Sequence, residues 1–389
     1  MKALVYGTAR SGKAVAARLA ERGDEAVLAD RSLGNEHDLT LLDGVTLLVK
    51  SPGVPGEAPL VVAARERGIP VWSEVEFAWR GLADGVRVVG VTGTNGKTTT
   101  VELLGEIFRE AGRTVAVAGN VGRPFAAVEG VDWVICELSS FQLEDVESLA
   151  CDVAVLLNLE PDHLDRHGSL EAYQDAKLRI FERARAKVVP RGSGLDGIEF
   201  SAVDDLPAEP LVRGVHNREN AAAATAAARA AGVPDDAIAA ALATFAGVPH
   251  RLEPVDVRGG VQFVNDSKAT NVAAARRALA AYGGDVVHLI LGGSLKGEDF
   301  APLAVAIGPN VTSIHLIGEA VPSLAEALVG RAVHDDGTLE RAVAHAASLA
   351  TAGDVVLLSP ACASYDQFDN FEHRGDEFRR IVAVLPAAS

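Results

Sequence analysis

Short apolar runs alternate with amphipathic, alanine-rich segments along the whole chain. Ten of the runs have the length and β-branched content of buried strands: KALVYG, EAVLAD, TLLVKS, VRVVGVTG, DWVICELS, DVAVLLN, VQFVND, VVHLILGG, SIHLIG and DVVLLSP. Strands that alternate with helices in this way usually pair in parallel, so the pattern predicts an α/β fold with mostly parallel sheets. Gly, Pro or polar residues follow each run, and ligand sites of α/β proteins gather at that end of the strands.

The chain has 389 residues, which at roughly 100–200 residues per domain predicts two or three domains. Two weak breaks, RGLADG (80–85) and FAGVPHRLE (245–253), favour three. We therefore expect domains at 1–83, 84–247 and 248–389. Residues 190–215 are expected to form short strands and turns at the edge of the middle domain.

The formal net charge of −17 and the pI near 5.0 disfavour a nucleic-acid or anionic-membrane partner, because such partners need clustered positive charge. No apolar run approaches the ~18 residues of a membrane span. The three cysteines, Cys136, Cys151 and Cys362, lack metal or redox spacing, and the N-terminus is a strand rather than an export signal. These features predict a cytoplasmic protein.

The stretch VTGTNGKTTT (91–100) has the order of a phosphate-binding loop: strand end, small residues, lysine, then helix. Its backbone N–H groups can approach phosphate, Lys97 can reach the β/γ oxygens, and Thr98 is the expected Mg²⁺ ligand. The strict GxxxxGK[ST] spacing would need Gly at position 91, where this chain has Val91, with Gly90 just before it. The loop predicts ATP binding but leaves the reaction open.

Two later strand ends carry further candidates. Glu137 ends DWVICE, a position suited to a carboxylate that coordinates Mg²⁺, although a helix-capping carboxylate is the alternative. His163, with Asp162 and Asp165, could contact metal or substrate, or could be structural.

Lys177 is the most unusual candidate, because it falls on the apolar stripe formed by Tyr173, Ile180, Phe181 and Ala184 at helical spacing. A buried stem with a snorkelling amine is one explanation. A lowered pKa that permits chemistry is the other, and spacing does not decide between them.

The first and last thirds add two weaker patterns. Gly7, Ala9 and Gly12 match GxGxxG with Ala at the second glycine, and Asp30 ends the next strand, which together indicate a diphosphate-bearing nucleotide. In the last third, polar residues follow several strands and could bind carboxylates or phosphates: Asp266, Lys268, Thr270, Lys296 and Ser364. The alternative is a capped helix start in NDSKATN and a helix whose core side is Phe368, Phe371 and Phe378.

Taken together, GTNGKTTT, ELSSFQLE, PDHLDRHG, YQDAKLRIFE, HNRENA, HRLE, NDSKATN and SPACASYDQFDNFEHRG closely resemble the motifs of the Mur ligases of peptidoglycan synthesis. The last two resemble those of the D-glutamate-adding members. The motifs run in the family's order from residue 7 to residue 378. The resemblance implies an N-terminal Rossmann-like domain for a UDP sugar, a central P-loop ATPase with a mostly parallel sheet, and a C-terminal Rossmann-like domain that closes over ATP. It also implies a monomer.

The implied reaction begins when ATP phosphorylates the terminal carboxylate of UDP-N-acetylmuramoyl-L-alanine. The amine of D-glutamate then displaces phosphate to form an amide. The implied cofactors are ATP and two Mg²⁺ ions, and the implied modification is a carbamate on Lys177.

By the same resemblance, the catalytic residues are Lys97, Asn120, His163 and Lys177, and the metal ligands are Thr98, Glu137, His163 and Lys177. The residues that match the family's ATP contacts are Gly93, Thr94, Asn95, Gly96, Lys97, Thr98, Thr99, Asn217, Asn220, His250, Arg251 and Asp266. Those that match its contacts to the UDP sugar are Thr8, Ala9, Arg10, Ser11, Gly12, Asp30, Arg31 and Asn120. Those that match its contacts to D-glutamate are Lys268, Thr270, Lys296, Ser364, Tyr365 and Phe371.

Three rival functions stay open at this point. One is another amide ligase of the superfamily, such as another Mur ligase or a folylpolyglutamate synthase. The second is a nicotinamide dehydrogenase built on the first glycine turn. The third is a nucleotide-regulated binding protein without catalysis.

Overall fold

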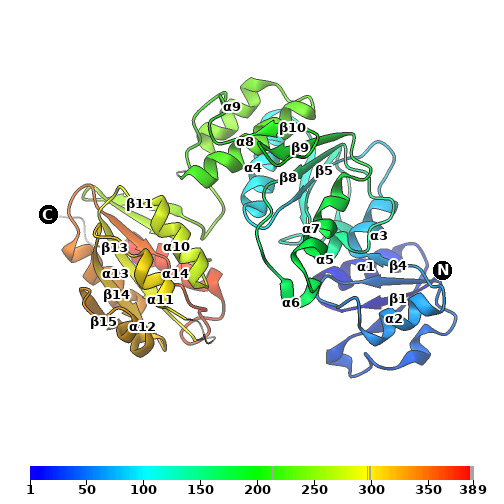
Figure 1. Ribbon diagram of the computed structural model, residues 1–389, viewed down its shortest axis with the longest axis horizontal. Coiled ribbons are helices and arrows are strands. Elements are labelled where there is room, and N and C mark those ends of the chain that lie inside the picture. Colours follow the sequence, from blue (N-terminus) through cyan, green and yellow to red (C-terminus); the bar gives the residue numbers. More distant parts are fainter. Residues whose placement is uncertain (213, 296, 298, 386–389) are drawn as a thin grey trace. The chain divides into compact units, whose positions relative to one another are not determined.

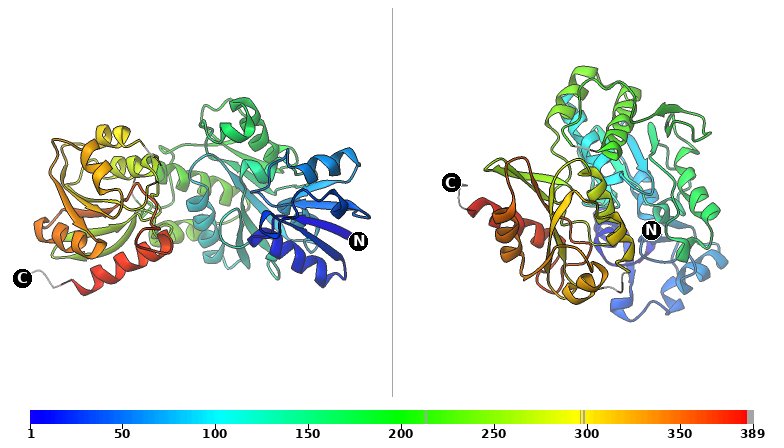
Figure 2. Two further views of the ribbon diagram at one scale, coloured as in Figure 1. Left: turned by 90° about the horizontal axis from the view of Figure 1, so that it is seen from below. Right: turned by 60° about the vertical axis from the view of Figure 1, so that its left-hand side comes forward.

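The computed structural model describes residues 1–212, 214–295, 297 and 299–385. They form three sheets with helices packed against them (Figures 1 and 2). The predicted α/β fold with mostly parallel sheets is confirmed, and each of the ten predicted strand runs contains a strand. Among the described residues, none of the helices combines the length and the apolar character needed to cross a bilayer.

The first sheet has the order β2-β1-β3-β4 and is parallel throughout. The glycine turn after β1 lies where the strand order reverses, the usual ligand position in such sheets. The strands are β1 (Lys2–Tyr6), β2 (Glu25–Ala29), β3 (Leu47–Lys50) and β4 (Val71–Ser73), and the helices are α1 (Arg10–Glu21), α2 (Pro59–Glu66) and α3 (Glu74–Arg80).

The second sheet, also parallel, has the order β10-β9-β8-β5-β7-β6. The phosphate loop leaves the central strand β5, between the carboxyl ends of β8 and β7. The strands are β5 (Arg87–Thr92), β6 (Val115–Gly119), β7 (Trp133–Glu137), β8 (Val153–Leu156), β9 (Ala186–Pro190) and β10 (Ile198–Phe200). The helices are α4 (Lys97–Glu110), α5 (Ser140–Leu143), α6 (Leu164–His167), α7 (Leu170–Leu178), α8 (Val215–Ala230) and α9 (Asp235–Thr244).

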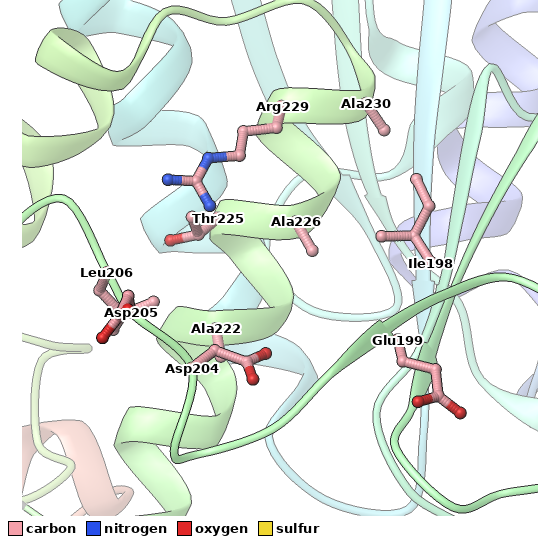
Figure 3. A pocket seen from close by; sticks show the side chains of 10 residues that line it. All are labelled: Ile198, Glu199, Asp204, Asp205, Leu206, Ala222, Thr225, Ala226, Arg229 and Ala230. Atoms are coloured by element: carbon pink, nitrogen blue, oxygen red, sulfur yellow. The ribbon is translucent and has the colours of Figure 1, made fainter.

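As predicted, residues 190–215 contribute a short edge strand, β10. A cavity of about 400 Å³ lies between β10 and α8 (Figure 3). The described residues that line it, Asp204, Thr225 and Arg229 among them, include none of the predicted site residues.

The third sheet has the order β11-β12-β16-β13-β14-β15, and all its pairs are parallel except β11 with β12. Buried apolar residues cover both faces, with α10 to α12 on one face and α13 and α14 on the other. The strands are β11 (Glu253–Arg258), β12 (Val261–Asn265), β13 (Val287–Gly292), β14 (Val311–Ile317), β15 (Val333–Gly337) and β16 (Val355–Leu358). The helices are α10 (Val272–Ala281), α11 (Ala301–Ala306), α12 (Val321–Ala327), α13 (Leu339–Leu349) and α14 (Phe371–Val384).

The chain divides into two compact units. Unit 1 holds residues 1–210 and 216–245, and unit 2 holds residues 211–215 and 246–389. The first two sheets lie together in unit 1 because they share one hydrophobic cluster, in which Val5 and Phe77 pack with Val134 and Leu156.

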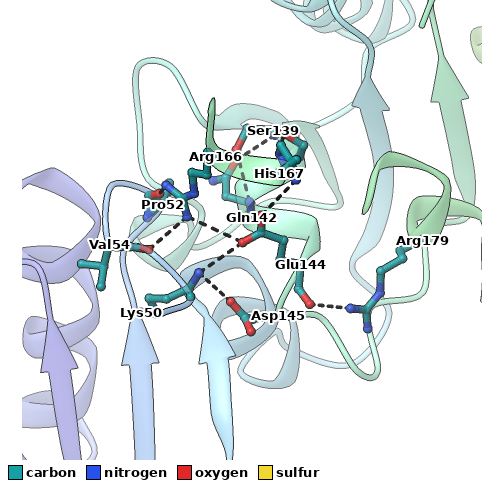
Figure 4. A network of polar contacts seen from close by, with 12 residues as sticks. Lys50, Pro52, Val54, Ser139, Gln142, Glu144, Asp145, Arg166, His167 and Arg179 are labelled. Atoms are coloured by element: carbon teal, nitrogen blue, oxygen red, sulfur yellow. Dashed lines mark hydrogen bonds and ion pairs between the residues drawn. The ribbon is translucent and has the colours of Figure 1, made fainter. Parts of the chain in front are cut away.

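A buried polar network also joins the first two sheets (Figure 4). Lys50, at the end of β3, contacts Asp145 Oδ2 at 2.7 Å and Glu144 Oε2 at 3.4 Å. Arg166 contacts Glu144 at 3.6 Å and donates to the carbonyls of Pro52 and Val54, at 2.8 and 3.0 Å. The contacts of Lys50, and those of Arg166 with Pro52 and Val54, span more than 90 positions of sequence, so they fix the end of β3 against the loops of the second sheet.

Candidate functional site

Two glycines give the phosphate loop its shape. Gly93 has φ +153° and Gly96 has φ +84°, conformations that L side chains rarely adopt. Gly90 has a different role: a Cβ there would lie 2.7 Å from Cys151 Sγ, so this glycine serves the packing of β5. The departure from the strict spacing therefore leaves the loop itself, Gly93 to Thr98, intact.

Side chains from the loop after β8 hold the phosphate loop from outside. Asn158 Oδ1 accepts from the Asn95 N–H at 2.9 Å, and Asn158 Nδ2 donates to the Asn95 carbonyl at 3.2 Å. Glu160 Oε2 accepts from Asn95 Nδ2 at 2.7 Å. The sequence analysis missed both Asn158 and Glu160; the motif LNLEPDH contained them, but only its histidine and aspartate suggested chemistry.

Thr98 and Glu137, two of the predicted site residues, come together, and Asn120 lies beside them. The Thr98 hydroxyl donates to Glu137 Oε2 at 2.9 Å, and Asn120 Nδ2 donates to Glu137 Oε1 at 3.2 Å. Glu137 is 2% exposed, so its carboxylate is a buried acceptor beside the phosphate loop. Hydroxyl and carboxylate oxygens are ligands that Mg²⁺ prefers.

Lys97 and Lys177 converge on one acceptor, the Gly93 carbonyl oxygen. Each Nζ lies 2.8 Å from that oxygen, and Lys97 Nζ also donates to the Thr94 carbonyl at 2.9 Å. The positive charge of Lys97 therefore lies at this point, beside the amine of Lys177. Such a point suits an anion with several oxygens, as a transferred phosphoryl group has.

The predicted burial of Lys177 is confirmed, since only 2% of the residue is exposed. Burial, followed by the positive charge of Lys97, lowers the pKa of Lys177 to about 7, and Asp162 and Glu137 oppose the shift. The Tyr173 ring centroid lies 4.8 Å from Lys177 Nζ, and the Tyr173 hydroxyl is 2.9 Å from Thr94 Oγ1. Lys177 is therefore packed under the loop and close to neutrality at physiological pH.

His163 lies at the start of α6 in a left-handed conformation, φ 51°. Its side chain is 49% exposed and its ring lies 4.9 Å from that of Phe141, while Asp162 Oδ2 is 3.5 Å from His163 Nε2. A non-glycine residue at positive φ carries backbone strain, which proteins tend to keep at functional positions. The side chain of Asp165 lies outside the part of the chain that the structure describes.

The two asparagines of HNREN lie on the first turns of α8. Asn220 is buried against the phosphate loop, because a Cβ on Gly96 would lie 2.2 Å from Asn220 Oδ1. Asn217 is 8% exposed and lies one turn earlier on the same helix.

In the N-terminal turn, Asp30 Oδ2 accepts from the Thr8 N–H at 2.6 Å, and Oδ1 accepts from Ser32. These bonds, the one from Thr8 first, hold the pKa of Asp30 well below its usual range. A Cβ on Gly12 would lie 1.9 Å from the Gly7 carbonyl oxygen, so glycine is required there. Ala9, Arg10, Ser11 and Arg31 occupy the same two turns, at the starts of α1 and of a short 3₁₀ helix.

In unit 2, Asp266 and His250 are parts of a buried network. Ser359 Oγ donates to Asp266 Oδ2 at 2.7 Å, and burial raises the pKa of Asp266 to about 7. His250 has φ 63°, accepts from Asn265 Nδ2 at 3.1 Å, and has a pKa lowered by burial. Arg251 follows directly and is part-buried.

The predicted amino-acid contacts follow β12 and β16. Lys268 Nζ lies 5.9 Å from the Phe371 ring centroid, Ser364 is buried, and Tyr365 is 71% exposed. Thr270 is part-buried, and Lys296 lies outside the described residues. The core role considered for Phe378 is confirmed, while Phe371 is part-buried at the start of α14.

Arg374, which the sequence analysis did not single out, holds these loops together. It is fully buried, and its guanidinium donates to the carbonyls of Ser267, Gly292, Cys362 and Ala363 and to Ser267 Oγ, at 2.9 to 3.3 Å. It therefore fixes the loops after β12, β13 and β16 relative to one another.

Comparison with known proteins adds the family. The models "Mur ligase middle domain" and "Mur ligase, glutamate ligase domain" match residues 91–193 and 250–362. A Myxococcus xanthus protein named UDP-N-acetylmuramoylalanine–D-glutamate ligase is 42% identical, over 99% of this chain and 98% of its own. A Gloeobacter violaceus protein of the same name is 42% identical over 96% and 91%. The solved UDP-N-acetylmuramate-alanine ligase of Thermotoga maritima shares the fold, with a TM-score of 0.62, 18% identity and coverage of 98% and 99%.

Proposed function

The chain belongs to the Mur ligase family of ATP-dependent ligases, and from that premise we propose that it joins D-glutamate to UDP-N-acetylmuramoyl-L-alanine. The full-length relatives at about 40% identity carry that activity in their names. The observation in this chain that supports the chemistry best is the pair of lysines, Lys97 and Lys177, beside Thr98 and Glu137.

The reaction needs an activated carboxylate, because a free carboxylate is a poor electrophile. An oxygen of the alanyl carboxylate attacks the γ-phosphorus of ATP and ADP leaves, which gives an acyl phosphate. The neutral amine of D-glutamate then attacks the acyl carbon, the C–O bond to phosphate breaks, and an amide, phosphate and a proton result. Lys97 and the loop N–H groups would stabilise the charge on the transferred phosphoryl oxygens.

The residues present fit a magnesium ion, because the Thr98 hydroxyl and the buried Glu137 carboxylate lie side by side at the phosphate loop. These two would hold one Mg²⁺, and His163 with a carbamylated Lys177 would hold a second. When bound, Mg²⁺ neutralises negative charge on the phosphate oxygens.

We extend the proposal to Lys177 itself, whose lowered pKa favours carbamylation. A neutral amine forms a bond to the carbon of CO₂ and releases one proton, which converts the uncharged side chain of Lys177 into a carboxylate-like anion. With a pKa of about 7, a large share of Lys177 is neutral at physiological pH. The carbamate would also remove the repulsion between Lys177 and Lys97.

For the remaining contacts we keep the predicted assignments as proposals. The UDP sugar would lie on the turn from Thr8 to Gly12 and beside Asn120, ATP on the phosphate loop, and D-glutamate beside Lys268 and Ser364. The boundaries 1–83, 84–247 and 248–389 are proposed with them. We also propose a cytoplasmic monomer; the three cysteines are free and buried.

Phosphate release from ATP tests the proposal. The protein is supplied with Mg²⁺ and UDP-N-acetylmuramoyl-L-alanine, and D-glutamate, L-glutamate and no amino acid are compared. We expect release that depends on D-glutamate. Turnover with UDP-N-acetylmuramoyl-dipeptide or folate, but not with the proposed substrate, would assign the chain to another ligase. If none of the substrate combinations gave phosphate release, the chain would be assigned to the non-catalytic binding proteins.

A further inference from the structure

Unit 2 holds a group of histidines that the ligase reaction does not use. His315 lies on β14, His334 and Asp336 on β15, and His345 on α13, which packs against both strands. The group lies on the face covered by α13, and it extends to His288 near the beginning of β13. The predicted amino-acid contacts follow the other ends of the strands.

The side chains are close and mostly buried. His315 Nδ1 lies 2.7 Å from Asp336 Oδ2, and His345 Nδ1 lies 2.8 Å from Asp336 Oδ1. His334 stacks on His315, with ring centroids 5.1 Å apart, and lies 4.5 Å from His345. His315 is 0% exposed and Asp336 6%, so this cluster (His315, His334, Asp336 and His345) is built into the domain.

A chain of hydrogen bonds extends from the cluster to a second carboxylate. His315 Nε2 lies 2.9 Å from Ser313 Oγ, Ser313 Oγ lies 2.7 Å from His288 Nδ1, and His288 Nε2 lies 3.4 Å from Asp354 Oδ2. With the contact from His315 to Asp336, four contacts connect two carboxylates. Carboxylates only accept hydrogen bonds.

With neutral histidines, these four contacts are one proton short. A neutral imidazole supplies one N–H and serine one O–H, so His288, Ser313 and His315 supply three protons for four contacts. Whichever way the three protons are arranged, one nitrogen lone pair faces an oxygen lone pair, of either a carboxylate or Ser313. A cation bound to His315 or His288, either a proton or a metal ion, would remove that unfavourable contact.

The geometry points to a divalent transition metal at the cluster, of the kind that Zn²⁺ represents, and we propose this site as an addition to the ligase site. Imidazole nitrogen and carboxylate oxygen are ligands typical of Zn²⁺. Within the described part of the chain, His315, Asp336 and His345 are the one group of three such side chains whose ligand atoms all lie within 4.8 Å of one another. A proton in place of a metal ion would join only one nitrogen to one oxygen. It would not account for the placement of His334 and His345 in the same cluster.

The surroundings also suit a metal. Bonds of about 2.0–2.2 Å need ligand atoms roughly 3–4 Å apart, which the present spacing meets after shifts below about 1 Å. Ser313 holds the second nitrogen of His315, as outer partners of metal-bound histidines usually do. The His345 side chain is 37% exposed, which gives an ion access from solvent. Bound there, the ion would tie the edge strand β15 to β14 and α13.

Metal binding to the full-length protein tests the site. Protein freed of metal with a chelator is first titrated with Co²⁺, and binding is followed by visible absorption. Zn²⁺ is then added as a competitor. Melting temperatures are recorded with and without Zn²⁺, and Mg²⁺ is present throughout. We expect one equivalent of Co²⁺ to bind in a low-symmetry site, Zn²⁺ to displace it, and Zn²⁺ to raise the melting temperature. His345→Ala and Asp336→Asn should weaken binding by at least about 100-fold.

His373→Ala is the matched control, because His373 is a partly exposed histidine of the same unit that pairs with one carboxylate, Asp369, at 3.4 Å. Its metal affinity should equal that of the wild type. His345→Ala changes a partly exposed side chain, so its far-UV circular dichroism should be unchanged. Any of three results would overturn the proposal. The wild type could fail to bind stoichiometric Zn²⁺, or His345→Ala could bind Zn²⁺ as tightly as the wild type. NMR could also show a doubly protonated His315 in protein that takes up no metal.

Discussion

Two buried lysines lie in contrasting regions of unit 1. Lys50 ends β3, where its side chain is 0% exposed and contacts the carboxylates of Asp145 and Glu144. Lys177 lies under the phosphate loop, is 2% exposed, donates to the Gly93 carbonyl and faces a second lysine, Lys97. The extent of burial is the same, but the partners have opposite charge.

The difference teaches that burial alone does not decide what a lysine does, because the charge of its partners opposes or reinforces the effect of burial. Beside carboxylates, the Lys50 ammonium completes ion pairs that join two sheets. Burial, reinforced by the charge of Lys97, makes the amine of Lys177 easy to deprotonate, and the neutral amine is the form that reacts with CO₂. The following changes test this contrast.

The largest effect should come from Lys97→Ala. The substitution removes the charge aimed at the transferred phosphoryl group, and D-glutamate-dependent phosphate release should fall by about 10³-fold or more. It also removes the charged neighbour of Lys177, so the pKa of Lys177 should rise. An activity within tenfold of the wild type would contradict the assigned role.

Lys177→Ala should lower turnover by about 10²–10³-fold, because the carbamate that would hold a metal ion is lost. Bicarbonate should partly restore activity by occupying the space left by the side chain, and chloride at equal ionic strength should not. Lys187→Ala, which removes a part-buried lysine of β9, is the control and should keep its activity. Full activity of Lys177→Ala would exclude the carbamate.

The same contrast predicts opposite effects on stability. Lys50→Met leaves Asp145 with Arg65, 2.8 Å away, as its remaining ion-pair partner, and should lower the free energy of unfolding by about 3 kcal/mol. Lys177→Met breaks no ion pair and should be neutral or stabilising at pH 7. Urea denaturation measures both. Lys2→Met, which removes an exposed pair with Glu25 at 3.7 Å, should change stability by less than about 1 kcal/mol.

The smallest effect is a pH dependence in CO₂-free buffer. Below pH 7 Lys177 is charged in the folded and the unfolded chain, so the cost of burying the charge is present in full. Between about 7 and 10.5 the folded chain loses this proton and the unfolded chain keeps it, so the contribution to stability rises with pH. Any stability gain from Lys177→Met should therefore shrink between pH 7 and pH 10; a gain that is constant with pH would argue against the lowered pKa.

The regular parts of the fold were predictable because periodicity is a local signal. Strands with long apolar runs, such as VHLILG in β13, were found, whereas β15, with the sequence VHDDG, was not, since polar residues on an edge strand hide its pattern. The phosphate loop was predictable for a similar reason, because Gly93 to Thr98 follow one another in sequence. The roles assigned to the site residues stay predictions.

Contacts between distant segments could not be predicted. Lys50 pairs with residues more than 90 positions away, and Arg374 bonds to Ser267, which is 107 positions before it. A single lysine or arginine in a sequence carries no sign of which carbonyl or carboxylate it will meet. Lys177 was noticed only because its helix placed it on an apolar stripe.

The central claim is that Lys177, and not Lys50, is the reactive lysine, and ¹³C NMR of full-length protein with ¹³C-bicarbonate and Mg²⁺ tests it most directly. We predict one carbamate resonance in the wild type and in a folded Lys50→Met variant, and its loss in Lys177→Arg. No carbamate signal in the wild type at saturating bicarbonate, or an undiminished signal in Lys177→Arg, would contradict the account.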